Sequence, residues 1–330
     1  MNGSCLKFVS PIEDAISRVR FAPGSNNLLI SSWDSNLRLY DVDRGILRLQ
    51  VSSEAALLDC CFENESVCLA SGCDGSVVRY DVHSEAQHLI GKHDDLATCV
   101  EYSIETGEIL SAGWDKKVRS WDPRITDAIR PYKDVGDVVK SMSISSNNLM
   151  IAVGKSVLLY DMRYFDQPIQ FKESCKEFQI KCVRSFSDSK GFAAGSIDGR
   201  VALEIIQPSL LLDKGYAFRC YPKSKDGKKY LCAVNDITFR PGVIGTFVTG
   251  SSDGYVIGWN AQAKKRQFEL PRHPNSVAGL SYNYSGQLLA VASSHTYQEA
   301  KEREEEPQIF VHAMDDEYIA SMSTGSSARK

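Results

Sequence analysis

Apolar and polar residues alternate in short stretches along the whole chain, and one kind of stretch returns at a nearly constant interval. Seven such stretches end on a large aromatic or aliphatic residue, at Phe21, Phe62, Tyr102, Ile144, Phe186, Phe239 and Tyr282. Successive ends lie 40–43 residues apart, except for one interval of 53. Alternation with a period of two is typical of β-strands, so the pattern predicts seven copies of one β unit.

A second phrase repeats with the same period. It consists of small residues, a turn that usually contains Asp or Gly, an alternating strand and, in most copies, an aromatic–acidic pair. Six copies are SSWDSNLRLYDV, SGCDGSVVRYDV, SAGWDKKVRSWDP, AVGKSVLLYDM, GSIDGRVALEI and GSSDGYVIGWN. A period of about 40–45 residues with four strands per unit indicates WD repeats. The sequence therefore predicts an all-β, seven-bladed WD-repeat β-propeller, in which radial packing of the sheets buries their faces.

The seventh unit must be completed from elsewhere in the chain. It supplies only three strands, within residues 276–282, 288–293 and 308–313. We expect Leu6–Val9 to form the fourth strand, beside Gln308–Ala313. The N-terminal strand then closes the ring.

The repeat accounts for residues 1–314 as a single domain. Two segments depart from it: an insertion at 207–233, which contains a strand-like piece at Tyr216–Cys220, and a charged loop at 298–307. The tail, residues 315–330, is rich in Ser and polar. We expect it to be disordered, because it has little apolar surface to bury.

Composition restricts the classes of partner. The 330 residues are 43% hydrophobic and 24% charged, with a formal net charge of −4. The lack of a basic excess disfavours direct binding to nucleic acid. No apolar run is long enough for a transmembrane helix, and the first ten residues lack the pattern of a secretory signal. Ten cysteines occur without a CxxC pair, so we expect no zinc site, no disulfides and no cofactor.

His93, Ser111, Asp115 and Trp121 include the residue types of a hydrolase triad, but their positions fit another role. They stand where a WD repeat places a loop His, a strand Ser, a turn Asp and a strand Trp. There the four side chains form one hydrogen-bonded chain that satisfies polar groups within a blade. No GxSxG, HExxH or phosphate-loop motif is present. We predict a structural tetrad, no catalytic residues and no enzymatic activity.

Two tryptophans and two arginines are candidates for binding. Trp33 and Trp114 each precede a turn Asp, where the loops of a propeller meet the central opening. Tryptophan is enriched among the residues that dominate binding energy; packing between neighbouring turns is the alternative. Arg200 follows the turn Asp198–Gly199, and Arg219 lies on the strand within the insertion. A guanidinium suits a phosphate or carboxylate, although either arginine alone fits an ordinary solvated surface.

Arg124 and Arg163 suggest a different use. Trp121–Arg124 and Tyr160–Arg163 share an aromatic-Asp-x-Arg pattern. Propellers that serve as substrate receptors of cullin ubiquitin ligases carry a similar box, although its first three positions belong to the repeat itself. The acidic run Glu299–Glu306 is interpreted as a solvated loop, with a basic partner as the alternative.

Seven phrases closely resemble one family of propellers. They are SSWDSNLRLYDV, GKHDDLATCVEYS, GWDKKVRSWDPR, GSIDGRVALE, KGYAFRC, TGSSDGYVIGWN and GQLLAVASS. In this order, over about residues 11–312, they are similar to the spindle-checkpoint family of the third "budding uninhibited by benzimidazole" protein. KGYAFRC is far more specific than a generic WD repeat. The messenger-RNA export propellers of the nuclear pore are a sister family, and Ser32-Trp33-Asp34 favours the checkpoint branch.

The resemblance implies a non-catalytic adaptor that works as a monomer within a larger complex. Its partners would be a partly helical segment of checkpoint kinases or pseudokinases of the budding-uninhibited family, and phosphorylated threonine motifs of a kinetochore scaffold. Trp33 matches the peptide-contacting tryptophan of the family, and Arg200 and Arg219 match the positions that receive the phosphothreonine. Such an adaptor brings checkpoint proteins to unattached kinetochores and delays anaphase. Its locations would be the nucleus, the kinetochore or centromere, the cytoplasm and the dividing cytoskeleton.

Several places depart from the family pattern. Lys181, which we group with Trp33 and Trp114 as peptide-binding, stands where the family usually has arginine, and lysine offers no planar fork. Tyr221-Pro222 replaces the His-Arg that follows YAFRC in the family. We interpret the chain as a divergent plant-type paralogue. A messenger-RNA export adaptor and a cullin-ligase substrate receptor are the alternatives.

Overall fold

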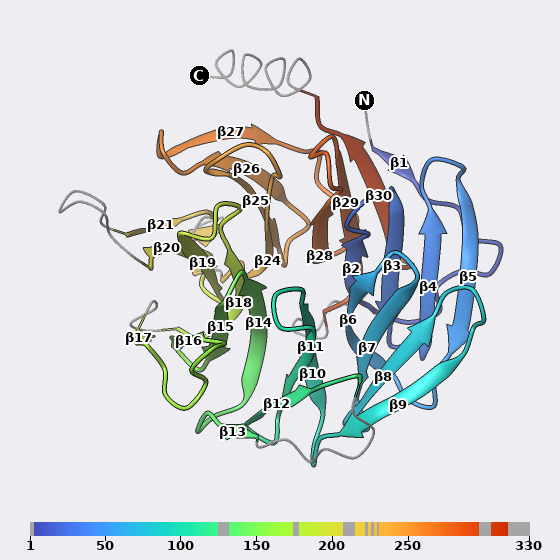
Figure 1. The fold of residues 1–330 in the computed structure, drawn as a ribbon. Helices are drawn as coiled ribbons and strands as arrows, with labels where there is room; N and C mark the ends of the chain where they lie inside the picture. The colour runs from blue at the N-terminus through green and yellow to red at the C-terminus, as the bar shows by residue number, and fades with distance from the viewer. Residues whose placement is uncertain are drawn as a thin grey trace.

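Seven four-stranded antiparallel sheets are arranged as blades around a central axis (Figure 1). The computed structural model describes residues 3–124, 132–173, 178–206, 215–221, 224–225, 228–229, 231–296 and 305–315. The predicted seven-bladed propeller is therefore confirmed. None of the described residues forms a helix with the length and apolarity needed to cross a membrane.

Each blade uses its strands in the same order from the axis outward. The innermost strands are β2 (Ile16–Phe21), β6 (Leu57–Asn64), β10 (Ala97–Ser103), β14 (Val139–Ser145), β18 (Ile180–Ser185), β24 (Val234–Phe239) and β28 (Val277–Tyr282). The second strands are β3 (Asn27–Ser32), β7 (Val67–Gly72), β11 (Glu108–Gly113), β15 (Asn148–Val153), β19 (Gly191–Ser196), β25 (Thr246–Ser251) and β29 (Leu288–Ser293).

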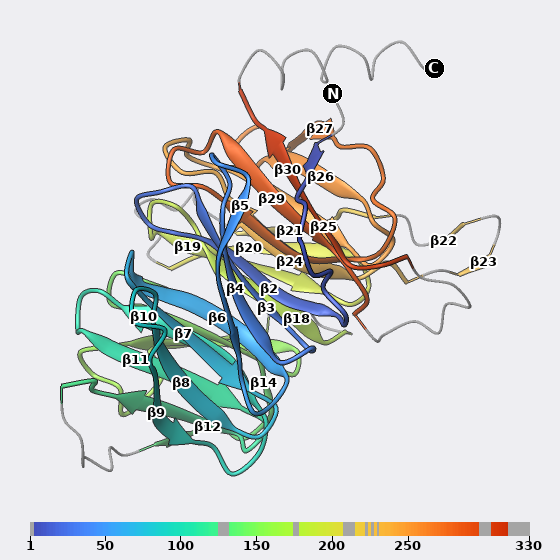
Figure 2. The same cartoon turned by 90° about the vertical axis from the view of Figure 1, so that its right-hand side faces the viewer.

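The outer half of each blade is more exposed and, except in blade 1, shorter. The third strands are β4 (Asn36–Asp41), β8 (Ser76–Asp81), β12 (Lys117–Trp121), β16 (Ser156–Asp161), β20 (Arg200–Ile205), β26 (Val256–Asn260) and β30 (Gln308–Ala313). The fourth strands are β5 (Ile46–Ser52), β9 (Gln87–Lys92), β13 (Lys133–Asp134), β17 (Gln170–Lys172), β21 (Tyr216–Arg219), β27 (Lys265–Glu269) and β1 (Ser4–Cys5). A hairpin, β22 (Ser224–Lys225) and β23 (Lys228–Lys229), lies outside the blades (Figure 2).

The core lies between neighbouring blades rather than within one. Leu110 and Val118 of blade 3, for example, pack against Val139 and Ile151 of blade 4. Second strands such as β3 and β19 are buried along their whole length, because a blade covers each of their two faces. The period of the sequence follows from this packing, since one sheet cannot bury both of its faces alone.

The antiparallel order gives the ring two different faces. On one face of the ring, the first strand of each blade begins and the second strand ends. The turn from the second to the third strand lies on this face, which we name the turn face. Trp33, Trp114 and Gly199 all lie in these turns, between the second and third strands of blades 1, 3 and 5. Candidate residues that are distant in sequence therefore share one side of the molecule.

The N-terminal strand closes the ring, as predicted, but its bounds differ from the expected Leu6–Val9. Ser4 pairs with Val311, and Cys5 pairs with Phe310, so that β1 is the outermost strand of blade 7. Beyond β1 the chain crosses from blade 7 to blade 1. The Phe8 and Tyr40 rings lie 5.2 Å apart between centroids, and Tyr40 Oη donates to the Lys7 carbonyl oxygen at 3.2 Å. Leu6 N–H still donates to the Ile309 carbonyl oxygen at 2.8 Å, and after Leu6 this packing against blade 1 draws the chain away from the sheet.

The segment predicted as an insertion also contains a regular part of the propeller. Its strand-like piece is β21, which pairs with β20 as the fourth strand of blade 5. The prediction of a strand outside the repeat was wrong, because the preceding residues lengthen the connection and hide the register. About half of the insertion, most of the charged loop 298–307, and the tail apart from Asp315 lie outside the described residues.

Phe8 offers a test of the contact that links the first and last blades. Replacing half-buried Phe8 with Ala removes its packing on Tyr40, and we expect this to lower the free energy of unfolding by about 2 kcal/mol. Val9 is 98% exposed, so Val9→Ala should change it by less than about 0.5 kcal/mol. Urea unfolding followed by circular dichroism measures both. Equal effects of the two substitutions would contradict the closure described here.

Two buried histidines lie in the closing blade. His273 Nε2 and His312 Nε2 are 3.2 Å apart, and His273 Nδ1 is 3.2 Å from the Gly254 carbonyl oxygen. Burial, together with neighbouring His273, lowers the pKa of His312 to about 4, and burial also lowers the pKa of His273. Both imidazoles are therefore neutral in the folded protein at neutral pH.

Acid should destabilise the protein through these histidines. The unfolded chain binds a proton at His312 below about pH 6.5, whereas the folded chain does so only near pH 4. The stabilising contribution is complete above pH 6.5 and is lost as the pH falls to 4, by at most about 3 kcal/mol for His312. Unfolding midpoints in urea from pH 7.5 to 4.5 measure it. His312→Gln should flatten the decline, and an unchanged slope would contradict this assignment.

Candidate functional site

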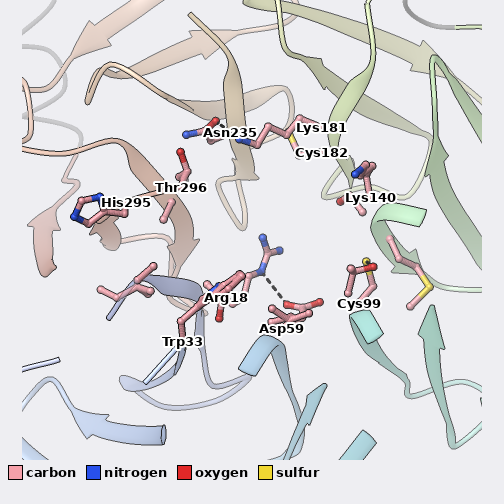
Figure 3. A pocket seen from close by; sticks show the side chains of 18 of the residues that line it. Arg18, Trp33, Asp59, Cys99, Lys140, Lys181, Cys182, Asn235, His295 and Thr296 are labelled. Carbon is pink, nitrogen blue, oxygen red and sulfur yellow. Dashed lines mark hydrogen bonds and ion pairs between the residues drawn. The ribbon is translucent and has the colours of Figure 1, made fainter. Parts of the chain in front are cut away.

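A cavity opens on the axis of the ring at the turn face (Figure 3). Its volume is about 260 Å³, and residues from all seven blades line it. Trp33 lies at its edge, and Lys140 and Lys181 face it from neighbouring blades. The structure thus brings two of the predicted peptide-binding residues, Trp33 and Lys181, into one site.

A β-bulge in every innermost strand builds the cavity wall. In each blade the pairing with the second strand shifts at the second residue of the first strand. A bulge re-aims a side chain and interrupts the alternation of faces. The seven residues at this position all line the cavity: Ser17, Leu58, Thr98, Lys140, Lys181, Asn235 and Ala278. The sequence search missed Lys140 and Asn235, although this shared position could have identified both.

Buried ion pairs lie deeper in the ring. Arg18 Nη1 is 3.1 Å from Asp236 Oδ2, and Arg184 Nη2 is 2.7 Å from Asp236 Oδ1. Arg18 Nε also lies 3.4 Å from Asp59 Oδ1. Burial raises the pKa of Asp59, against the opposing effect of Arg18 and Arg20. Removing one partner from such a network leaves an uncompensated buried charge, so these ion pairs tie the innermost strands together. Arg18, Asp59 and Arg184 also line the cavity.

The turn that carries Trp33 is fixed by a charged cluster. Arg38 Nη2 donates to Asp34 Oδ2 at 2.7 Å, and Arg38 Nη1 donates to Asp34 Oδ1 at 3.0 Å and to Ser32 Oγ at 2.8 Å. Burial opposes ionisation of Asp34, but the hydrogen bonds from Arg38 and Ser32 outweigh it and lower its pKa. The indole of Trp33 remains 39% exposed. A rigid turn with an accessible ring costs little entropy when it binds a partner.

Trp114 occupies the corresponding turn of blade 3. It is 43% exposed, and Lys140 Nζ lies 5.0 Å from the centroid of its ring, within cation–π range. Trp114 does not line the cavity itself, but Lys140 does. Lys181 Nζ donates to Asn235 Oδ1 at 2.7 Å across to blade 6. Trp33, Trp114, Lys140 and Lys181 therefore present aromatic and cationic groups around one opening.

The four residues predicted as a tetrad form one hydrogen-bonded chain. His93 Nδ1 is 3.0 Å from both carboxylate oxygens of Asp115, His93 Nε2 is 2.7 Å from Ser111 Oγ, and Trp121 Nε1 donates to Ser111 Oγ at 2.8 Å. Burial lowers the pKa of His93. Ser111 is fully buried, and its hydroxyl is occupied by His93 and Trp121. This geometry supports the blade and leaves no room for a substrate at the hydroxyl.

Arg200 and Arg219 meet on a single carboxylate. They are directly opposite each other in the pairing of β20 with β21. Arg219 Nη2 donates to Asp198 Oδ2 at 2.8 Å and Arg219 Nη1 donates to the Asp198 carbonyl oxygen, while Arg200 Nε is 3.3 Å from Asp198 Oδ2. The Asp198 side chain is 2% exposed and that of Arg200 is 51% exposed. Two guanidinium groups on one carboxylate leave a surplus positive charge at the turn face.

Other blades share part of this arrangement. Lys92 Nζ donates to the turn Asp74 at 2.8 Å. In blade 6, Arg272 Nε donates to the Asp253 carbonyl oxygen at 2.7 Å, and Nη2 donates to Asp253 Oδ1 at 2.5 Å. A cation from the outer edge of the blade thus holds the turn carboxylate in all three cases. Blade 5 differs in having a second cation, Arg200, where blade 6 has Tyr255.

Comparison with known proteins agrees with this architecture. The model for "WD domain, G-beta repeat" matches residues 3–41 and 84–122. The chain is 49% identical to "Mitotic checkpoint protein BUB3.3" of Arabidopsis thaliana, over 95% of this chain and 100% of that protein. The chain belongs to the BUB3 family. It is also 39% identical to "Mitotic checkpoint protein BUB3.1" of the same plant, over 93% of this chain and 92% of that protein.

Other similar proteins share less of the sequence than the BUB3 relatives do. "Protein Rae1" of Drosophila melanogaster is 28% identical over 93% of each chain. The solved structure "Structure of U3-55K" has a TM-score of 0.80 at 13% identity, over 94% of this chain and 98% of that chain, which shows a common fold alone. The resemblance to the checkpoint branch is confirmed by the higher identity of the BUB3 relatives.

Tyr221, which we interpret as a departure from the family pattern, has a structural role. Its hydroxyl is 2.8 Å from Thr249 Oγ1, to which Trp259 Nε1 donates at 3.0 Å. Tyr221 is buried and takes the place in blade 6 that His93 takes in blade 3. Tyr221 therefore belongs to the inside of a blade rather than to its surface.

The arginines of the aromatic-Asp-x-Arg boxes fold back on their own aspartates. Arg124 Nε and Nη2 donate to Asp122 at 2.8 and 2.9 Å, and Arg163 Nε and Nη2 donate to Asp161 at 3.0 and 2.6 Å. Both boxes follow the ends of third strands, on the face opposite the turn face. They are not brought together with the tryptophans or with Arg200.

Tyr221 can be tested separately from binding. Tyr221→Phe removes the hydroxyl and leaves Thr249 without that partner, so we expect the free energy of unfolding to fall by about 1 kcal/mol. Tyr284→Phe removes an exposed hydroxyl and should have no effect. Chemical denaturation of the two variants makes the comparison. Equal stability of Tyr221→Phe and the parent chain would disprove the structural role.

Proposed function

We propose that this BUB3-family chain is a non-catalytic mitotic spindle-checkpoint adaptor that binds its partners on the turn face. The observation that supports this most directly is the grouping of Trp33, Lys140 and Lys181 around the open cavity, with the Arg200–Arg219 pair on the same face. One ligand is a segment of a checkpoint kinase or pseudokinase. The other is a phosphorylated threonine motif of a kinetochore scaffold.

The charge arrangement in blade 5 suits a phosphothreonine. The phosphate carries about −1.5 to −2 charges and three strong acceptor oxygens. Asp198 orients Arg219. Arg200 contacts the same carboxylate through Nε, and we assign the terminal N–H groups of Arg200 to the phosphate. Charge-assisted bonds from a guanidinium fork to a phosphate are stronger than bonds between neutral groups. Affinity would then depend on a kinase.

The tryptophans suit the apolar part of a peptide. Trp33 is fixed by the Asp34–Arg38 cluster, and Trp114 is contacted by Lys140. Exposed tryptophans on rigid turns are typical anchors of protein interfaces. The lysines add attraction for acidic residues beside the anchor. A partly helical segment laid across the opening would contact both tryptophans.

These ligands define where the protein acts. The adaptor, a monomer within a larger complex, would recruit checkpoint proteins to unattached kinetochores in the nucleus of dividing cells and delay anaphase. The messenger-RNA export role is less favoured, because the chain is 26% identical to "Poly(A)+ RNA export protein" of Schizosaccharomyces pombe but 49% identical to BUB3.3 of Arabidopsis thaliana. A cullin-ligase role is less favoured, because Arg124 and Arg163 are each engaged by their own aspartate.

Calorimetric titration with a kinetochore-scaffold peptide tests the phosphate site. We expect binding to the phosphothreonine form and at least tenfold weaker binding to the unphosphorylated form. Arg200→Ala and Arg219→Ala should each weaken the phosphate-dependent binding about tenfold or more, since each removes a charge-assisted contact. Trp33→Ala should instead weaken binding of a checkpoint-kinase segment.

Arg272→Ala is the matched control for Arg219→Ala. Arg272 makes the same two kinds of contact with its turn aspartate, so the two variants lose the same structural bond. Only Arg219→Ala, in blade 5, should lose affinity for the phosphopeptide. Equal affinity of the chain for both peptide forms, or equal losses in both variants, would overturn the phosphate-reading proposal.

A further inference from the structure

A second cavity lies far from the axis, between the outer strands of blades 5 and 6. Tyr216 and Phe218 line it from β21, and Trp259 lines it from the end of β26. Phe247, Asn260, Lys264 and Lys265 complete its wall. We name this cavity the outer pocket. Tyr216 begins a fourth strand and Trp259 precedes the end of a third strand, so the outer pocket opens toward the face opposite the turn face.

The aromatic walls of the outer pocket are fixed by their own contacts. The Phe218 ring meets Trp259 edge to face, at 4.9 Å between centroids, and lies 6.4 Å from Phe247. Tyr216 Oη donates to the Ala261 carbonyl oxygen at 2.6 Å, which ties β21 to blade 6. The pocket is therefore formed before any ligand arrives, and binding would require little rearrangement.

Size limits what the outer pocket can hold. Its volume is about 190 Å³, which is below the range of about 300–1,000 Å³ typical of small-molecule sites. It is sufficient for one large side chain. Four aromatic rings around that space favour an apolar side chain, because burial of apolar surface drives such contacts.

The rim of the outer pocket is positively charged. Lys264 Nζ lies 4.6 Å from the centroid of the Tyr216 ring, and Lys265 is exposed beside it. The residues that line this pocket include both lysines and no carboxylate. Acidic residues on either side of an inserted side chain would therefore meet complementary charge.

The backbone at Lys264 is set by its turn. Lys264 has φ = +53°, a left-handed conformation that favours glycine. Gly45 (φ = +67°) and Glu85 (φ = +59°) have the same conformation in the corresponding turns of blades 1 and 2. Glycine at position 264 would therefore keep the turn while removing the ammonium group beside the Tyr216 ring.

We propose that the outer pocket binds an extended acidic segment of another protein, with one large apolar side chain of that segment inserted among the aromatic rings. This site is independent of the checkpoint ligands, because it lies on another face and uses other residues. The chain would then hold a third partner while its turn face is occupied.

Four acidic peptides that differ at one residue test the proposal. Each has the same Glu-, Asp- and Gly-rich sequence around a central Leu, Met, Phe or Ala, and fluorescence anisotropy measures its binding to the full chain. We expect at least one of the three apolar peptides to bind ten times more tightly than the Ala peptide, and the binding to weaken as salt is raised. No binding by any apolar peptide, or equal binding by all four, would overturn the proposal.

Substitution of Lys264 locates the binding. Lys264→Gly relieves the backbone, so the variant should fold at least as stably as the parent chain and bind the best peptide at least fivefold more weakly. Lys116→Gly is the matched control, because Lys116 is also exposed, has φ = +64° and lies in a turn of blade 3. It should leave peptide binding unchanged.

Arg200→Ala separates this proposal from the phosphate site. It should leave binding of the acidic peptides unchanged, even if it abolishes phosphopeptide binding. Retention of full peptide affinity by Lys264→Gly, or its loss in Arg200→Ala or Lys116→Gly, would place the acidic peptides outside the outer pocket and overturn the proposal.

Discussion

Each blade is apolar on both of its faces and can be covered only by two neighbours. This constraint organises the molecule. Inside the ring, residues such as Leu110 and Val139 are buried between neighbouring blades, but an open row would leave the outer faces of its first and last blades exposed to water. The ring therefore closes, and β1 completes blade 7 from the other end of the chain. Closure in turn creates an axis, and the β-bulges of the innermost strands direct Lys140, Lys181 and their equivalents into the space around it.

In the proposed function, the same residues of the turn face serve both structure and binding. Asp198 holds Arg219 as Asp253 holds Arg272, so this contact is first a device that fixes a turn. Arg200 adds a second cation in blade 5. If the cluster also binds the phosphate, as we propose, then a variant of Arg219 loses a structural contact and a binding contact together, and it must be compared with the same variant of Arg272.

The period of the sequence was sufficient to predict the seven blades, their innermost strands and the tetrad around His93, because these depend on local patterns repeated many times. The bounds of the N-terminal strand could not be predicted, since Phe8 packs against Tyr40 rather than within the sheet. Tyr221 was seen as a departure, but its bond to Thr249 depends on a neighbouring blade. The outer pocket was missed for a similar reason: its aromatic residues fit the pattern of ordinary core positions.

The pairing of β1 with β30 has a consequence for synthesis of the protein. Ser4 and Cys5 emerge from the ribosome more than 300 residues before their partners Val311 and Phe310. At about 5–20 residues per second, translation of the intervening chain takes roughly 15–60 s. Throughout that time the growing row of blades has uncovered apolar ends and its first strand has no sheet to join. Exposed apolar surface and unpaired strand edges make such an incomplete chain prone to aggregation until the final blade is made.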